Sequence, residues 1–467
     1  MSKESQPTHI STEEWATCTK VLQAISDDPD LLPEEMPTLL SLMSKIYKAA
    51  RKKRRQREKL NRTNHMRVMQ EATLRCQAEP LDEMNLANYK PIIAEATQTT
   101  KRLPKVLKCY ICQAQYQDLH FFYHRLCPAC ATYNYIKREQ RIDLSGRTAL
   151  VTGGRVKLGY AIALKLLRDG ARVIVVTRFP RNAAQRYTQE SDFEDWAHNL
   201  KIYGLDLKNI PLVENFIHHL LDAEDYLDII INNAAQTIKR PDDFYANLLP
   251  MEKATLATVP EKIKTLLGDD NLTIKKTDEI LHPIALPINT HFPTGKYDLY
   301  GEQIDLRKHN SWTTKLEDID TIELLEVQLI NAVAPFLLNS RLKSLLLKSP
   351  HSNRFIVNVS SAEGQFSYKL KTAAHPHTNM AKAALNMITR TSAKDYAKYN
   401  IFMNSVDPGW FTQEIPYPKK TELRQQGMVP PLDIIDGAAR LYDPIIQGIK
   451  GSPCYGQLLK DYRPREW

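Results

Sequence analysis

The segment Thr152–Gly159 (TGGRVKLG) limits most strongly what this chain can fold into. It follows the apolar run Ala149–Val151, and beyond it Ala161, Leu164 and neighbouring apolar residues recur at helical spacing. A buried strand, a glycine turn and a helix in this order can hold a pyrophosphate. The glycines let the backbone approach it, and the helix N-terminus offers free N–H groups. The sequence therefore predicts an α/β fold with a Rossmann-like, doubly wound parallel sheet.

The chain has 467 residues, which is too long for one hydrophobic core, so more than one domain is expected. We divide it into a helical region (1–105), a small four-cysteine module (106–141) and the Rossmann-like domain (142–467), which carries an insertion at about 236–320.

The formal charge is +9, and most of it lies in residues 51–62, where eight basic residues accompany one acid. The remainder of the chain is nearly neutral, so charge alone does not make the whole protein a nucleic-acid binder.

The basic run 51–62 has two interpretations. One is a solvated helix face or an arm for an acidic partner, and the other is a nuclear-import signal or a nucleic-acid patch. The first is favoured, because no aromatic side chains interleave with the charges as base stacking would require.

We find no apolar run long enough to span a bilayer and no signal-peptide core, so we expect a cytoplasmic protein without membrane contact. Nuclear localisation is the alternative that the basic run leaves open.

Four of the seven cysteines form two Cys-x-x-Cys pairs separated by fourteen residues. The paired residues are Cys109, Cys112, Cys127 and Cys130. Four thiolates at this spacing can close a tetrahedral Zn²⁺ site, and four protein ligands leave no open position for catalysis. We therefore expect structural zinc, with His120 and His124 as substitute ligands that four cysteines make unnecessary. The module is interpreted as a clamp that fixes the N-terminal helices to the Rossmann-like domain.

Further motifs follow the glycine turn in order: Asp206-Leu207, then Asn232-Asn233-Ala234-Ala235 after an apolar strand, then Pro408-Gly409. With the stretch that begins at Asp143, they make the chain resemble the short-chain dehydrogenase/reductase family over nearly all of its remaining length. That family's first motif is Thr-Gly-x-x-x-Gly-x-Gly, in which Lys157 here replaces the middle glycine. The resemblance implies that these motifs hold a nicotinamide dinucleotide. The implied cofactor-binding residues are Gly153, Arg155, Lys157, Leu158, Gly159, Arg178, Asp206, Leu207, Asn233, Ala234, Lys382, Pro408 and Gly409.

The end of the predicted second strand, 172–177, selects between the two nicotinamide cofactors. No acid stands there, and Arg178 follows. An acid would bind the ribose 2′-hydroxyl of NAD and repel a 2′-phosphate, whereas an arginine accommodates that phosphate. We therefore expect NADP(H).

The resemblance also implies catalytic positions, with one departure. Asn331 matches a helical asparagine that holds a water linked to the active-site lysine, Ser361 matches the catalytic serine, and Lys382 matches the lysine. The family's tyrosine, four residues before that lysine, is replaced here by Thr378. A threonine hydroxyl ionises far too weakly to act as a general acid.

Two alternatives remain for the missing tyrosine. His375 stands seven residues before Lys382, which is the spacing of the tyrosine in enoyl-reductase relatives, and histidine titrates near neutrality. Either His375, or the nearby His377, supplies the proton, or both histidines lie in a loop held by Pro376 without a chemical role.

Three functions from different classes are therefore considered. The first is an NADP(H)-dependent oxidoreductase that transfers a hydride to or from a carbonyl, imine or alkene of a small molecule. The second is a catalytically weak NADP(H)-binding sensor or scaffold, and the third and least favoured is a nucleic-acid-associated protein. We expect a homo-oligomer, and the insertion at 236–320 is either a substrate lid or an oligomer arm.

Overall fold

A computed structural model describes residues 10–31, 37–77, 101–268, 290–298 and 300–467. The chain forms two units, Met1–Met66 and Arg67–Trp467. The elements of the first unit are α1 (Thr12–Asp27), η1 (Pro29–Leu31) and most of α2 (Pro37–Glu71). Helix α1 begins with a capping box, in which the backbone N–H of Glu14 donates to the Ser11 hydroxyl and the Glu14 carboxylate accepts the Ser11 N–H. The expected helical N-terminal region is confirmed, and the basic run 51–62 is exposed on α2.

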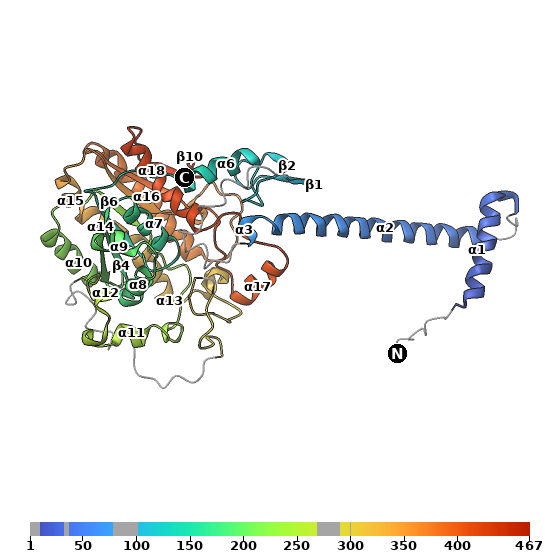
Figure 1. Cartoon of the computed structure of the whole chain (residues 1–467), viewed down its shortest axis with the longest axis horizontal. Coiled ribbons are helices and arrows are strands. Elements are labelled where there is room, and N and C mark those ends of the chain that lie inside the picture. Colours follow the sequence, from blue (N-terminus) through green and yellow to red (C-terminus); the bar gives the residue numbers. More distant parts are fainter. Residues whose placement is uncertain (1–9, 32–36, 78–100, 269–289, 299) are drawn as a thin grey trace. The chain divides into compact units, whose positions relative to one another are not determined.

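The second unit contains an eight-stranded sheet (Figure 1). Its strands are β3 (Thr148–Thr152), β4 (Arg172–Thr177), β5 (Leu200–Gly204), β6 (Ile229–Asn232), β7 (Arg354–Val359), β8 (Ile401–Asp407), β9 (Leu458–Lys460) and β10 (Arg463–Arg465). Their spatial order is β10-β9-β8-β7-β6-β3-β4-β5, and every pair except β9–β10 is parallel. The strand order reverses between β3 and β6, so the predicted doubly wound Rossmann-like sheet is confirmed.

Helices cover both faces of this sheet. They are α7 (Lys157–Arg168), α8 (Pro180–Tyr187), α9 (Phe193–Trp196), α10 (Ile210–Ala223), α13 (Thr321–Gln328), α14 (Ala334–Arg341), α15 (Lys343–Lys348), α16 (Pro376–Ala397) and α18 (Ile434–Ile449). A further helix, α17 (Tyr417–Gln425), has no buried residue. Alternate residues of β3 enter different cores: Ala149 and Val151 lie with residues of α7 and α18, whereas Leu150 lies with residues of α10, α14 and α16. This alternation is the two-residue period expected of a strand buried on both faces.

A buried amide network holds the centre of the sheet. The side-chain N–H₂ of Asn232 donates to the side-chain oxygens of Asn339 and Asn358, both at 2.8 Å. Asn358 in turn donates to the Thr389 hydroxyl at 2.8 Å, which also accepts from Ser405 at 2.8 Å. Such bonds fix orientation, because an unpaired buried amide would lose its hydration without compensation. The network thereby ties β6, β7 and β8 to α14 and α16.

The four-cysteine module consists of the hairpin β1 (Lys101–Lys108) with β2 (Gln115–Leu119), followed by α6 (Pro128–Arg138). It is attached to α18 by buried charges. The Arg138 guanidinium lies 2.6 Å from the Asp433 carboxylate and 3.1 Å from that of Asp436, and the Tyr123 hydroxyl donates to Asp436 at 2.5 Å. Removing one member of such a buried cluster leaves an uncompensated charge, so the cluster fixes where the module sits.

The insertion contributes several short elements. They are η5 (Asp242–Tyr245), α11 (Leu249–Lys253), η6 (Leu256–Thr258), α12 (Glu261–Lys264), η7 (Ser311–Thr313) and η8 (Leu316–Asp318). Part of it joins the edge of the sheet, because the N–H of Ile202 donates to the Leu266 carbonyl and the N–H of Gly268 donates to that of Ile202. The insertion is therefore partly built onto the Rossmann-like core.

One sequence expectation needs correction. The continuous helical segment Thr321–Lys348 is, by length and composition alone, apolar enough to cross a membrane, although we expected no such run. The physical reason lies in its role in the core: Ile330, Ala334 and Leu338 are buried in the cluster beneath the sheet. A helix that supplies one wall of a large core carries the same apolar composition as a membrane span.

Candidate functional site

A cavity of about 1450 Å³ opens at the carboxyl ends of the strands, where the strand order reverses. Most of the residues assigned from sequence line it. They are Gly153, Arg155, Lys157, Leu158, Gly159, Arg178, Asp206, Leu207, Asn233, Ala234, Ser361, Thr378, Lys382, Pro408 and Gly409. Ligands of open α/β sheets bind in the crevice at this reversal point, so the cavity is the candidate site.

The glycine turn brings three backbone segments unusually close together. Gly153 has a φ of +72°, and a Cβ at Gly159 would lie 2.1 Å from the Gly153 carbonyl oxygen. A Cβ at Gly153 would lie 2.9 Å from the Cα of Ala234. Only glycine fits at both positions, and Val156 before α7 has no side-chain acceptor to cap the helix. The turn therefore leaves room and N–H groups for an anion such as a pyrophosphate.

The two cations of this turn are already paired with acids. The Arg155 guanidinium lies 2.6 Å from the Glu302 carboxylate, which comes from the insertion. The Lys157 ammonium lies 3.9 Å from the Glu414 carboxylate, which follows β8. Lys157 also adopts a left-handed φ of +52° at the position where the family motif has glycine. The charges that would face an incoming phosphate are thus partly neutralised.

Arg178 lies at the end of β4, on one side of the turn. Its guanidinium donates to the Tyr245 hydroxyl at 2.7 Å and lies 4.7 Å from the centre of that ring. The Asp206 carboxylate accepts the N–H of Lys208 at the end of β5. This end of the cavity has an exposed guanidinium and an aromatic ring beside it, which suits a phosphorylated ribose and its base.

Ser361, Thr378 and Lys382 lie at the opposite end of the cavity. Lys382 sits one helical turn after Thr378 on α16, and its ammonium donates to the Val359 carbonyl at 2.7 Å. Burial lowers the pKa of Lys382 from its ordinary 10.5 to about 8, which the negative charge of Glu363 only partly offsets. The Thr378 hydroxyl is buried, and within the described ranges no partner donates to it or accepts from it.

The remaining two assigned residues do not line the cavity. Asn331 lies in a π-helical turn (η9, Leu329–Val333) between α13 and α14, so the expected interruption of the helix is present. Its side-chain amide makes two hydrogen bonds to the backbone of Gln236. The amide oxygen accepts the N–H at 2.7 Å, and the amide N–H₂ donates to the carbonyl at 3.2 Å. It therefore fixes the segment that follows β6 rather than touching Lys382 directly.

His375 is turned towards the insertion. It begins α16 with a φ of +44°, its ring stacks on Trp312 at 4.0 Å between ring centres, and one ring nitrogen lies 2.9 Å from the Trp312 carbonyl oxygen. Burial lowers its pKa below the ordinary value. His377 is also buried, with a ring nitrogen 3.3 Å from the Glu323 carboxylate. Neither histidine is among the residues that line the cavity, so the geometry favours the alternative in which they have no chemical role.

Sequence reasoning missed several residues that the fold brings to the cavity. Tyr110, Ile111 and Gln113 come from the first cysteine pair, whereas Arg240 and Trp312 come from the insertion. No local pattern could have found Tyr110, because its contact partner lies 300 residues further along the chain.

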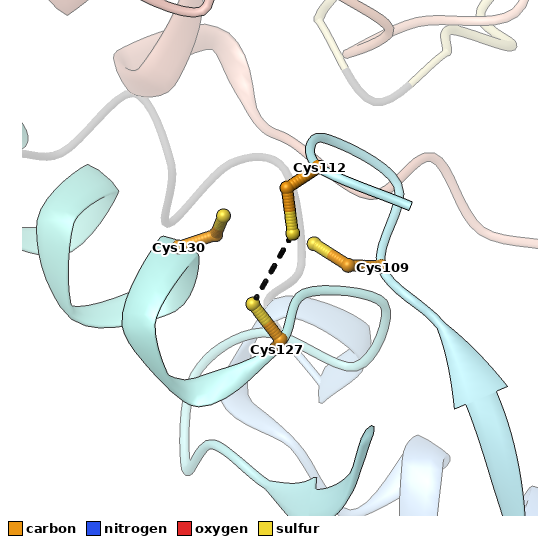
Figure 2. Close-up of side chains that lie close together, drawn as sticks. All are labelled: Cys109, Cys112, Cys127 and Cys130. Atoms are coloured by element: carbon orange, nitrogen blue, oxygen red, sulfur yellow. Dashed lines mark hydrogen bonds between the residues drawn. The ribbon is translucent and has the colours of Figure 1, made fainter. Parts of the chain in front are cut away.

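The four cysteine side chains point towards a common centre (Figure 2). All four sulphur atoms lie within 4.8 Å of one another, and the Cys112 and Cys127 sulphurs are 3.6 Å apart. A tetrahedral zinc site with bonds of about 2.3 Å requires sulphur–sulphur separations of roughly 3.8 Å. The donor set therefore fits a four-coordinate zinc ion.

Fold and cavity define a Rossmann-type protein with a crevice at the reversal point of its sheet. Two family models match the second unit: short chain dehydrogenase over residues 147–253, and Enoyl-(Acyl carrier protein) reductase over residues 303–426. The chain belongs to the short-chain dehydrogenase/reductase family, a family of oxidoreductases. The unmatched stretch between the two models falls within the insertion expected at 236–320.

Individual relatives differ in how much of the chain they share. An uncharacterized protein of Acanthamoeba polyphaga mimivirus is 32% identical over 349 residues, which cover 72% of this chain and 71% of that protein. Dehydrogenase/reductase SDR family member 13 of Bos taurus is 36% identical over 105 residues, covering 22% of this chain and 28% of the relative. Among solved structures, the RhlG/NADP active-site complex of Pseudomonas aeruginosa matches at 19% identity and a TM-score of 0.45, over 68% of this chain and 95% of that one.

We predict that Lys382→Met stabilises the cofactor-free protein at pH 7. A lysine whose pKa falls from 10.5 to about 8 on folding carries a cost on the order of 3 kcal/mol at neutral pH. Between those pH values the unfolded chain binds a proton that the folded chain lacks, so wild-type stability rises with pH and the advantage of the variant shrinks. Urea unfolding followed by circular dichroism at pH 7 and pH 10 measures both effects.

The exposed Lys394→Met on the same helix is the control and should change neither value. A Lys382→Met protein that is less stable than wild type at pH 7, with the same difference at pH 10, would contradict this prediction.

Proposed function

We propose that this protein is an NADP(H)-dependent oxidoreductase that reduces or oxidises a small carbonyl, imine or alkene compound. One observation carries the proposal: the glycine turn, Arg178, Ser361 and Lys382 line a single cavity at the reversal point of the sheet. The glycine turn lies in its middle, a guanidinium at one end and a serine–lysine pair at the other. This is the order in which a dinucleotide presents its adenosine, pyrophosphate and nicotinamide parts.

The cofactor would be held in the following way. The N–H groups of the first turn of α7 would bind the pyrophosphate, and Arg178 would bind the ribose 2′-phosphate. Lys382 would donate to the ribose hydroxyls of the nicotinamide half. When bound, NADPH supplies a hydride.

We predict that the protein binds NADPH more tightly than NADH and that Arg178→Asp reverses the preference. Loss of a charge-assisted bond to the 2′-phosphate should weaken NADPH binding by about 10- to 100-fold, whereas NADH binding should change little. Fluorescence titration of both cofactors measures this. The control is Lys262→Asp, an equal change of charge at an exposed residue. An equal loss of affinity for both cofactors in Arg178→Asp would count against the assignment.

The substrate would bind beside Ser361, whose hydroxyl would donate to the substrate oxygen or nitrogen as negative charge develops there. Reduction then requires a proton at that atom. Thr378 is too weak an acid to provide it, and the group of the cavity whose pKa comes nearest to neutrality at this end is Lys382, at about 8. We therefore assign the proton to the Lys382 ammonium, delivered directly or through the Thr378 hydroxyl.

We predict that Ser361→Ala retains NADPH affinity and loses turnover by about 10²- to 10³-fold, the usual effect of removing one such donor. The measurement is NADPH oxidation with a panel of aldehydes, ketones, imines and activated alkenes, together with NADPH titration of the same sample. Ser340→Ala on α14, outside the cavity, is the control. Full activity of Ser361→Ala on a turned-over substrate would remove this serine from the mechanism.

A second function is favoured by one observation, the threonine at the position of the family's tyrosine. A protein without a strong acid at that point could bind NADP(H) and report on it without turnover. The same panel separates the two functions: tight NADPH binding with no oxidation of NADPH across the panel would favour the sensor. Nucleic-acid binding by the basic run remains the least supported alternative, and salt-dependent binding of a generic duplex would detect it.

We propose one structural zinc ion per chain, held by the four cysteines. Thiolate ligation makes such an ion part of folding, so it should survive purification without added metal. Elemental analysis is predicted to give one zinc per chain, and Cys112→Ser should lower this value, whereas Cys18→Ser, another exposed cysteine, should not. Metal-free wild-type protein with four freely titratable thiols in the module would disprove the site.

A second copy of the chain is the proposed partner. Large apolar side chains are exposed on two neighbouring helical segments, Leu325 and Phe336 on α13 and α14, and Met380 and Met387 on α16. Exposed apolar groups of this size gather at interfaces between subunits. We propose a cytoplasmic homo-oligomer.

A further inference from the structure

The four-cysteine module contributes directly to the wall of the cofactor cavity. Tyr110 and Ile111 lie between the first two cysteines, and together with Gln113 they line the cavity. The same cavity wall includes Gly409 and Trp410, which follow β8. A module that served only as a clamp would not need to present side chains there.

The contact between the module and the cavity is specific. The Tyr110 hydroxyl accepts the backbone N–H of Trp410 at 3.0 Å. Gly409 has a φ of +84°, and a Cβ at that position would lie 3.8 Å from the Tyr110 hydroxyl and 2.6 Å from a Leu432 methyl group. The N–H of Gly409 donates to the Asp407 carboxylate at 2.8 Å. Two hydrogen bonds therefore hold this turn in one conformation, and one of them is made by Tyr110.

The position of Tyr110 is itself fixed. Its N–H donates to the Arg125 carbonyl at 2.9 Å, which joins the loop of the first cysteine pair to the segment just before the second. The Arg125 guanidinium lies 5.7 Å from the centre of the Trp410 ring. Behind this contact, Arg138 and Tyr123 tie the module to α18 through the buried carboxylates described above. These contacts fix the position of Tyr110 between the cysteine module and the Rossmann-like domain.

The turn at Gly409 lies at one defined end of the cavity. Arg178 and Asp206 mark the end at β4 and β5, and the pyrophosphate turn lies between them and β8. A dinucleotide that spans this crevice with its adenosine near β4 has its nicotinamide half near β7 and β8. Gly409 and Trp410 therefore face the nicotinamide half.

We propose that the cysteine module is a part of the cofactor site and that Tyr110 is a positioning residue, which holds the Gly409–Trp410 backbone against the nicotinamide half. This inference rests on the proposed function. Tyr110 acts through its hydrogen bond to the backbone. The module thereby shapes one half of the dinucleotide site and leaves the other half to the Rossmann core.

The test compares two ligands. NADPH contains both halves, whereas 2′-phospho-ADP-ribose lacks the nicotinamide ring. Tyr110→Phe is expected to weaken NADPH binding by about 3- to 10-fold, the effect of one hydrogen bond, and to leave binding of 2′-phospho-ADP-ribose unchanged. Tyr116→Phe is the matched control, because it removes a hydrogen bond inside the same module, to the His124 carbonyl, at a residue that does not line the cavity. Calorimetric titration measures both affinities for the wild type and for each of the two variants.

Arg125→Met keeps the inference testable if Tyr110→Phe does not fold, because this side chain is exposed. It removes the cation beside Trp410 and should weaken NADPH alone by about 2- to 5-fold. Equal weakening of both ligands, or no change in either variant, overturns the role of Tyr110 while leaving the proposed function intact. If the wild-type protein binds neither ligand, the proposed function fails and this inference fails with it.

Discussion

The fold depends on a backbone contact too tight for any side chain. At the reversal point of the sheet, Gly159 lies so close to the Gly153 carbonyl that a Cβ would overlap it, and a Cβ on Gly153 would also lie too close to Ala234, at 2.9 Å from its Cα. These contacts bring the start of α7 against the ends of β3 and β6, which leaves the crevice open between them. The amide of Asn233 completes the contact by donating to the Thr152 carbonyl at 3.0 Å. Every later element that reaches the cavity is placed relative to this junction.

Local patterns could predict the parts of the site that are local in the chain. The strand, glycine turn and helix occupy about twenty consecutive residues, and the cysteine pairs a similar length, so their residue types and spacing are sufficient. His375 shows what such counting leaves open. Its spacing from Lys382 predicts a place in the site; in the structure it precedes α16 with a left-handed φ, and its ring stacks on Trp312, which lines the cavity, without lining the cavity itself. The contact with Trp312 joins residues 63 positions apart, so counting from Lys382 could not reveal it.

The four-cysteine module shows a second limit of prediction from local sequence patterns. Arg138 is nearly three hundred residues away from Asp433 and Asp436 along the chain, yet the three side chains are buried together. Nothing in the sequence near Arg138 indicates the two aspartates at the start of α18. Charges buried in this way add little stability compared with apolar residues of the same size, but each one is costly to leave unpaired. The cluster therefore specifies one arrangement of the module on α18, and it does so through residues that a sequence pattern would assign to the surface.

The pairing of Arg155 with Glu302 changes what an anion meets at the glycine turn. The Arg155 guanidinium is already paired with a carboxylate from a segment outside the Rossmann core. An entering phosphate would have to replace that carboxylate at Arg155. Its affinity would therefore reflect the difference between the free energies of binding the phosphate and of binding Glu302. The displaced Glu302 would carry its own segment with it, since the N–H of Glu302 is bound by the Asp298 carboxylate at 3.0 Å. Because Tyr300 and Gln303 on either side of Glu302 are buried, such a displacement would disturb packing as well as an ion pair.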